Sequence, residues 1–165
     1  MTLYSELYSI LNTQCFRYSA MDAPRDQLWK VADESEAASW AAQGSLGSGS
    51  ALDQQDGFIH TSDARMVREV ARRFFAGKAG LRLLRIGMRE LGGTAPVMLT
   101  HETPTGTPDT LRIGTARAVV HCLPDGCAHI YHTADQPVPW SAITVFDLPL
   151  GADGEHIFPR ECPMD

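Results

Sequence analysis

The sequence lacks several features that would assign it at once to a familiar class of protein. It has four cysteines in 165 residues, at positions 15, 122, 127 and 162, too few and too unevenly spaced for a secreted domain held by disulfides. Its uncharged apolar runs fall far short of the about 20 residues that a membrane-spanning helix needs. Its first residues also lack the basic and apolar regions of a signal peptide. We therefore expect a cytoplasmic protein with no membrane partner.

Positive charge is also scarce. Fourteen Lys and Arg residues stand against twenty Asp and Glu residues, which gives a net charge of −6. This balance argues against an extended nucleic-acid surface, because such surfaces neutralise the phosphate backbone with many basic side chains. The sequence has no nucleophile elbow, phosphate-binding Gly-Lys-Ser/Thr loop, dinucleotide-binding glycine turn or His-Glu-x-x-His helix, so the commonest hydrolases, P-loop enzymes and zinc proteases are excluded.

What the sequence does have is enough apolar residues, 44% of the chain, to bury one core. We expect a single domain over residues 27–158, with an N-terminal extension at 1–26 and a C-terminal tail at 159–165. The extension carries apolar residues at helical spacing between Leu3 and Leu11. The small residues of 44–50 are interpreted as a mobile loop. The sequence gives no indication of the oligomeric state.

The order of the expected elements predicts an α+β domain. A capping box at Asp33 and Glu36 predicts a helix that ends at Gly44, and a second helix is expected from Thr61 to about residue 76. Residues 53–56 are expected to form a polar turn. The turn at 123–126 predicts a hairpin, because proline and glycine suit its two corners. Strands are expected at 28–31, 57–60, 81–88, 96–102, 111–122, 127–133 and 142–148.

The strongest candidate for a functional site is His60, followed by Thr61 and Ser62, where a strand leads into a helix. The N–H groups of a helix N-terminus bind anions such as phosphate, and a histidine adds a donor or a proton carrier near neutral pH. A small phosphorylated or nucleotide ligand is therefore one interpretation. The other is structural: the hydroxyls cap the helix, and His60 is a hydrogen-bonded strand residue.

A second candidate is the strand at 127–133, where His129 and Tyr131 lie on one face and are predicted to line a pocket. Tyr131 would alternatively fill the core. Glu102 closes an earlier strand, where a carboxylate either orients a sugar hydroxyl or acts as a base. It could equally be a solvated loop residue.

Two further groups of residues have both a functional and a simpler interpretation. The set of His121, Cys122, Cys127 and His129 has zinc-binding residue types, but its spacing does not match a zinc knuckle, so we expect ordinary hairpin side chains and no metal. Arg65, Arg68 and Arg72 form a basic stripe that would suit a phosphate-bearing partner. The negative net charge favours a solvated helix face instead.

Five segments of the sequence are Asp53–Ser62, Arg73–Gly77, Leu81–Ile86, His129–Tyr131 and Val138–Ile143. Together they resemble a small family catalogued as domain of unknown function nine-five-two. The resemblance covers about residues 28–158, and its Gly-Phe-Ile-His-x-Ser element is the most specific part. The sequence departs from the family pattern at Met98–Glu102 and Cys127–Tyr131, and its connection from Thr103 to Gly126 is longer than usual.

The resemblance implies a fold similar to ADP-ribosyltransferases, with a split, mostly antiparallel sheet, two or three helices and a cleft that holds NAD in active relatives. In those relatives a histidine or arginine holds a ribose, a tyrosine stacks on nicotinamide and a glutamate grips the ribose while the glycosidic bond breaks. Residues of these types here are His60, Tyr131 and Glu102, with His60 and Glu102 as the catalytic candidates. The implied function is a nucleotide- or NAD-binding enzyme acting at a ribosyl bond. The alternative is a non-catalytic module that binds a ligand or a protein.

Overall fold

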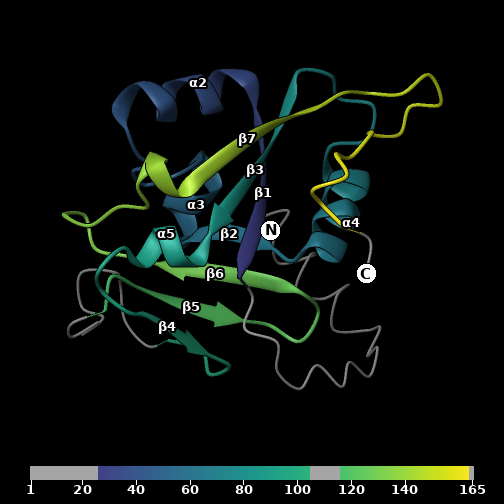
Figure 1. Ribbon diagram of the computed structural model, residues 1–165. Helices are drawn as coiled ribbons and strands as arrows, with labels where there is room; N and C mark the ends of the chain where they lie inside the picture. Colours follow the sequence, from purple (N-terminus) through teal and green to yellow (C-terminus); the bar gives the residue numbers. More distant parts are fainter. Residues whose placement is uncertain (1–25, 105–115, 164–165) are drawn as a thin grey trace.

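Seven strands form one mixed sheet in the computed structural model, which describes residues 26–104 and 116–163 (Figure 1). The strand order is β4-β5-β6-β2-β1-β3-β7; β4 and β5 are parallel and the other described pairs are antiparallel. The strands are β1 (Gln27–Asp33), β2 (Ile59–Ser62), β3 (Leu81–Gly87), β4 (Val97–Thr100), β5 (Ala118–Cys122), β6 (Cys127–Tyr131) and β7 (Ile143–Leu148).

Four α-helices and one short 3-10 helix connect these strands within the described residues. The two longer helices are α2 (Glu34–Gln43) and α4 (Ala64–Phe74). The shorter elements are α3 (Ala51–Asp56), α5 (Met88–Gly92) and η1 (Trp140–Ala142). The predicted α+β class and mostly antiparallel sheet are thus confirmed, and the two longer helices are those expected from the sequence.

The short helices were not predicted, for different reasons. Asp53–Asp56 was expected to be a turn, but Ser50 and Asp53 form a capping box in which each side chain accepts a hydrogen bond from the other's backbone N–H. This cap stabilises the first turn of α3. Helix α5 begins at Met88, the last residue of the strand expected at 81–88, and its N-cap Gly87 makes no side-chain cap bond. It therefore carries no start signal in the sequence.

The segment 44–50, interpreted as a mobile loop, is built into the fold. Leu46 is fully buried, and its N–H donates to the carbonyl of Val138. Ser45 forms a bridge with Pro139, and Ser50 caps α3. The predicted hairpin is confirmed as β5 and β6, whose register pairs Val120 with Ile130. The helix expected near Leu3–Leu11 and residues 111–115 of one expected strand lie outside the described residues.

The sheet divides at the boundary between β1 and β2. These strands share one registered pair, Trp29 with Ser62, whereas β1 and β3 pair from Gln27 with Gly87 to Asp33 with Leu81. Figure 1 shows the consequence: β1, β3 and β7 run in a clearly different direction from β4, β5 and β6. The candidate site lies where these two strands separate.

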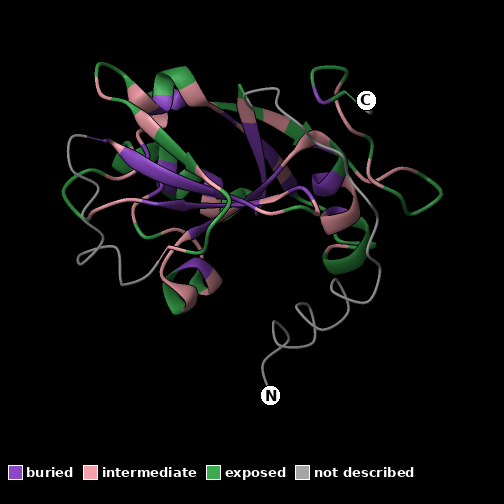
Figure 2. Ribbon diagram, turned by 90° about the horizontal axis from the view of Figure 1, so that it is seen from below, coloured by how far each residue is buried: buried purple, intermediate pink, exposed green. Residues whose placement is uncertain are grey.

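Buried side chains gather on both faces of the sheet, and Figure 2 shows that they concentrate in the strands. On one face, α4 packs against β1 through Val67 and Ala71, which contact a cluster that includes Trp29 and Leu83. On the other face, Trp40 of α2 and Leu91 of α5 belong to a larger cluster with Ile130. Among the described residues, no helix has the length and apolar character needed to cross a membrane.

Candidate functional site

The histidine singled out in the sequence, His60, is held by a buried aspartate. Asp53 projects from α3, and its Oδ1 accepts hydrogen bonds from the backbone N–H of His60 and from Nδ1 of the His60 ring, both at 2.8 Å. The side chain of Asp53 is fully buried and that of His60 is 13% exposed. The bond from Nδ1 fixes the orientation of the ring, and the other ring nitrogen, Nε2, is buried and faces the carboxylate of Asp56 at 3.2 Å.

Lys30 completes this cluster from the neighbouring strand. Its Nζ lies 2.8 Å from Oδ2 of Asp53 and donates to the carbonyl of His60 at 3.3 Å. Lys30 therefore spans the place where β1 and β2 separate. Burial alone would raise the pKa of Asp53, but the hydrogen bonds from His60 and the charge of Lys30 outweigh it and hold the pKa well below its usual value. Asp53 is thus ionised and neutralised by Lys30.

The strand register places the histidines of three strands side by side. His60 of β2 pairs with His129 of β6, which pairs with His121 of β5, and His121 pairs with Thr100 of β4. Residues paired in this way point to the same face of a sheet. Ring centroids are 5.4 Å apart for His60 and His129 and 5.9 Å for His121 and His129. We call this line of three rings the imidazole row.

Two aromatic side chains, Phe58 and Tyr131, lie beside the imidazole row at His129 and His60. Phe58 stacks on His129 with centroids 4.0 Å apart, and it also lies 4.6 Å from the His60 ring and 5.1 Å from that of Tyr131. Phe58 and His60 are half-buried, whereas His129 and Tyr131 are buried. A ligand approaching this cluster would first contact Phe58 and His60.

Burial keeps the inner imidazoles neutral. It lowers the pKa of His129 to about 3, with a further contribution from the charge of His60, and it also lowers the pKa of His121. Nδ1 of His121 is buried and has no hydrogen-bond partner in the described part of the chain. Buried polar atoms are rarely left in this state, so a ligand or a water is the expected partner.

The two hydroxyls predicted to bind an anion with His60 lie on different faces of β2, because Thr61 is one residue from His60 and Ser62 is two. Thr61 points to the opposite face of β2, and its Oγ1 donates to the carbonyl of Ala128 at 2.7 Å. Ser62 is buried and still pairs with β6. Helix α4 begins at Ala64 rather than Thr61, because Asp63 is the N-cap and accepts from the N–H of Met66. The first turn of α4 therefore has its own carboxylate.

Glu102, the predicted carboxylate of the site, lies just beyond β4. It is exposed, and its N–H donates to Oγ1 of Thr100 at 3.0 Å. Three strand spacings separate β4 from β2, so the backbones at Thr100 and His60 are roughly 14 Å apart. The structure thus brings His60, His129 and Tyr131 together and places Glu102 at the far end of the imidazole row.

The structure also shows the surroundings of the candidate metal ligands and of the arginine stripe. Within residues 26–104 and 116–163, no group of three or more His, Cys, Asp or Glu side chains is arranged to hold a metal ion. The three arginines of the stripe do not form one surface for an anion. Arg65 donates to the carbonyl of Asp125, Arg68 to that of Cys162, and Arg72 to the carboxylate of Glu69.

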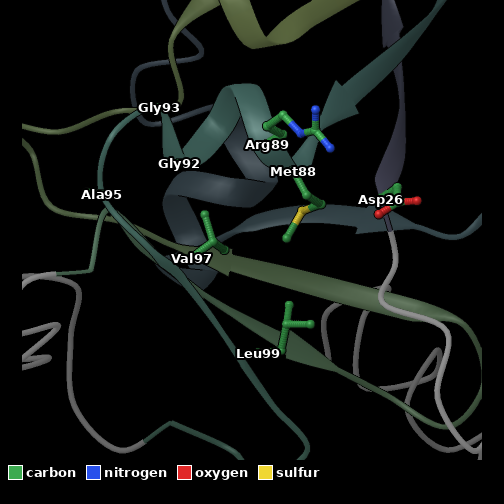
Figure 3. A pocket seen from close by; sticks show the side chains of 8 residues that line it. All are labelled: Asp26, Met88, Arg89, Gly92, Gly93, Ala95, Val97 and Leu99. Atoms are coloured by element: carbon green, nitrogen blue, oxygen red, sulfur yellow. The ribbon is translucent and has the colours of Figure 1, made fainter.

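One pocket in the described residues lies away from this cluster. It has a volume of about 360 Å³ and is formed by α5, the start of β1 and β4. Figure 3 shows Met88 and Val97 facing this space, with Leu99 below them. Val97 and Leu99 alternate with Thr100, so the pocket opens on the face opposite the imidazole row. None of the predicted site residues lines it.

Three residues that define the site, Lys30, Asp53 and Phe58, were not predicted from the sequence. Asp53 carried a readable signal, since Ser50 and Asp53 have the spacing of a capping box. Phe58 lay within the segment that carries the family resemblance. Lys30 gave no signal, because a lysine in a short strand is normally an exposed residue and its burial depends on the opening of the sheet.

Comparison with known proteins was made with family models, curated proteins and solved structures. Residues 31–145 match the family described as "Protein of unknown function (DUF952)". No curated protein matches the chain. The chain is similar to protein CC0527 from Caulobacter crescentus. Its crystal structure is 28% identical over 82% of this chain and 97% of that chain, with a TM-score of 0.55. The crystal structure of a double mutant of CC0527 is 27% identical, with the same coverage and TM-score.

Proposed function

The chain belongs to the family described as "Protein of unknown function (DUF952)". For this member of the family we propose that it binds a nucleotide, NAD foremost, along the imidazole row. The observation that carries the proposal is the cluster of Phe58, His60 and His129 beside the opening of the sheet, with His60 fixed by Asp53. Stacked rings next to an oriented imidazole suit a ligand that combines a base with ribose and phosphate groups.

The length of the row supports a nucleotide as the ligand. Roughly 14 Å separate His60 from the end of β4, where Glu102 lies, so the two side chains would contact different parts of one extended ligand. In this arrangement Phe58 and His60 hold the adenosine and phosphate end. Glu102 lies beside the second ribose. The likeness to ADP-ribosyltransferases that the sequence suggests belongs to this proposal, because fold and function are separate questions.

The proposed chemistry is cleavage of the bond between the ribose and the nicotinamide of NAD. The C–N bond breaks, and its electron pair leaves with nicotinamide. Water forms the new bond at the ribose carbon and releases its proton to solvent. Glu102 stabilises the positive charge that develops on the ribose, while His60 orients the nucleotide. The buried and unpaired Nδ1 of His121 is a polar group on the same face that the ligand could satisfy.

Two measurements test the proposal. The protein is incubated with NAD and release of nicotinamide is followed, and a panel of nucleotides is tested by thermal shift. A ligand at about 100 times its Kd should stabilise the folded protein by about 2.7 kcal/mol. Glu102→Gln should abolish release, because it removes the charge that stabilises the developing ribose cation. The variant should still fold, since Glu102 is exposed, and should keep a thermal shift from the contacts of Phe58 and His60 with the other end of the ligand. Glu161→Gln, which removes another exposed carboxylate, is the control.

The results separate the proposal from its alternative. Nicotinamide release that depends on Glu102 supports the enzyme. A thermal shift without release supports the non-catalytic ligand-binding module. The absence of both with every nucleotide would overturn the proposed function.

A further inference from the structure

The second aspartate next to His60 is held in a different way from the first. Oδ2 of Asp56 lies 3.2 Å from Nε2 of His60, close enough for an ion pair but outside good hydrogen-bond geometry. The Asp56 side chain is 20% exposed, whereas that of Asp53 is fully buried. Asp53 is also bound by Lys30 and Ser50. Asp56 makes no other ion pair or side-chain hydrogen bond in the described residues.

The place of Asp56 in the helix is also unfavourable. It is the last residue of α3, and Gly57 follows as the C-cap in a left-handed conformation. A carboxylate at a helix C-terminus is repelled by the partial negative charge of the exposed carbonyls. The helix therefore does not favour a carboxylate at this position, and the contact with Nε2 of His60 is the main interaction of Asp56.

We propose that the carboxylate of Asp56 occupies the position of a ligand phosphate oxygen on Nε2 of His60. This inference rests on the proposed function, because it takes the ligand to be a nucleotide. The charges of Lys30 and Asp53 cancel each other, so the anion opposite Nε2 interacts mainly with the ring itself. In the absence of ligand Asp56 fills this position with a weak contact. A phosphate group displaces it and accepts a better-aligned bond.

The test measures binding to variants that remove this competing carboxylate. Asp56→Asn and Asp56→Ala are titrated by calorimetry with NAD, inorganic pyrophosphate and nicotinamide riboside, which lacks phosphate. Both variants should bind NAD and pyrophosphate about five- to tenfold more tightly than the original protein, a coupling of ordinary size. Their affinity for nicotinamide riboside should not change. Glu161→Gln, which removes one negative charge at a distant exposed position, should leave all three affinities unchanged.

A nuclear magnetic resonance measurement locates the binding. In protein labelled with ¹⁵N at histidine, pyrophosphate should shift the Nε2 signal of His60 more than that of His156, a half-buried histidine whose Nε2 contacts the Lys78 carbonyl. This second readout uses the original protein, so it does not depend on the folding of a variant.

The outcomes distinguish this inference from the proposed function. Unchanged or weaker NAD and pyrophosphate binding in both Asp56 variants would overturn the inference, as would equal tightening for nicotinamide riboside. Tighter pyrophosphate binding with a shift at His60, but without binding of any nucleotide, would support the anion position and overturn the proposed function. Nucleotide binding that ignores Asp56 would leave the proposed function standing and reject the inference.

Discussion

Asp53 accepts hydrogen bonds from both the backbone N–H and the ring of His60 through a single carboxylate oxygen. One side chain of α3 thus determines both the path of β2 and the orientation of its histidine. Its other oxygen binds Lys30 of β1 and the backbone N–H of Ser50. The position of His60 therefore depends on three segments that are separate in the sequence.

Asp53→Asn should destabilise the protein by about 3–5 kcal/mol, because it leaves the buried Lys30 without its counter-charge. The free energy of unfolding is measured in urea. Lys30→Met should also destabilise, since it leaves the Asp53 charge uncompensated. The double variant should lose less than the sum of the two single losses, as expected for groups in direct contact. Additive losses would contradict the coupling described for this pair.

The free energy of unfolding should decrease as the pH is lowered from about 6.5, because His129 takes up a proton on unfolding. The pKa of His129 is about 3 in the folded protein, below the ordinary value of about 6.5 expected after unfolding. The unfolded chain therefore takes up this proton first, and stability decreases from about pH 6.5 downward. Between pH 6.5 and pH 5 the loss from this residue should be roughly 2 kcal/mol. Unfolding in urea at several pH values measures the slope.

The control for this slope is His129→Phe, which keeps a ring against Phe58 and removes the titrating group. Its stability should depend less on pH between 6.5 and 5 than that of the original protein. The titration of Asp53 does not affect this comparison between pH 6.5 and pH 5. Its pKa is lowered on folding, so its contribution is fully present above about pH 4, the unfolded value, and is lost as the pH falls further. An unchanged slope in His129→Phe would refute the assignment.

Thr61→Val should cost about 1 kcal/mol of stability, because it removes the hydrogen bond from the Thr61 hydroxyl to the Ala128 carbonyl. Nucleotide affinity should stay the same, since this hydroxyl points to the face opposite the imidazole row. Thermal unfolding and calorimetric titration measure the two quantities. Reduced affinity with unchanged stability would instead place Thr61 in contact with the ligand, as the sequence first suggested.

Gly126→Ala should destabilise the start of α4. Gly126 has a φ of +103°, and an added Cβ would lie 2.6 Å from a carboxylate oxygen of Asp63. Asp63 is the N-cap of α4, and its N–H donates to the Gly126 carbonyl. We expect a loss of about 2 kcal/mol or more from strain and disturbed capping. In a background that already carries Asp63→Ala the added loss should be smaller, and equal losses in both would argue against the predicted collision.

The sequence predicts most of the fold because its signals are local. The capping box at Asp33, the Pro-Asp-Gly turn before Cys127 and the alternation in β3 each depend on neighbouring residues, and each appears in the structure. The site is harder to predict because it depends on contacts between distant segments. Strands β1 and β2 separate beside the single pair between Trp29 and Ser62, and Lys30 is buried there against Asp53. No periodic pattern in the sequence encodes that register.

The candidate site residues also differ in whether local sequence patterns were enough to place them. His129 and Tyr131 share a strand, so period-two alternation was enough to place them on one face. Thr61 was assigned to the site from its proximity to His60 along the chain, although the same alternation directs it to the other face. The end of β2 could not be distinguished from the start of α4, because threonine and serine suit both.

The single registered pair between β1 and β2 also has a consequence for the order in which the chain folds. The hairpin of β5 and β6 pairs residues that are close in sequence, whereas β3 and β7 bring Leu81 to Leu148. Long chain closures are slow because their entropy is lost before their contacts form. With little pairing to connect the two halves of the sheet, the half that contains the hairpin should gain protection first in pulse-labelled hydrogen exchange. Simultaneous protection of β3 would mean that the two halves assemble as one cooperative unit.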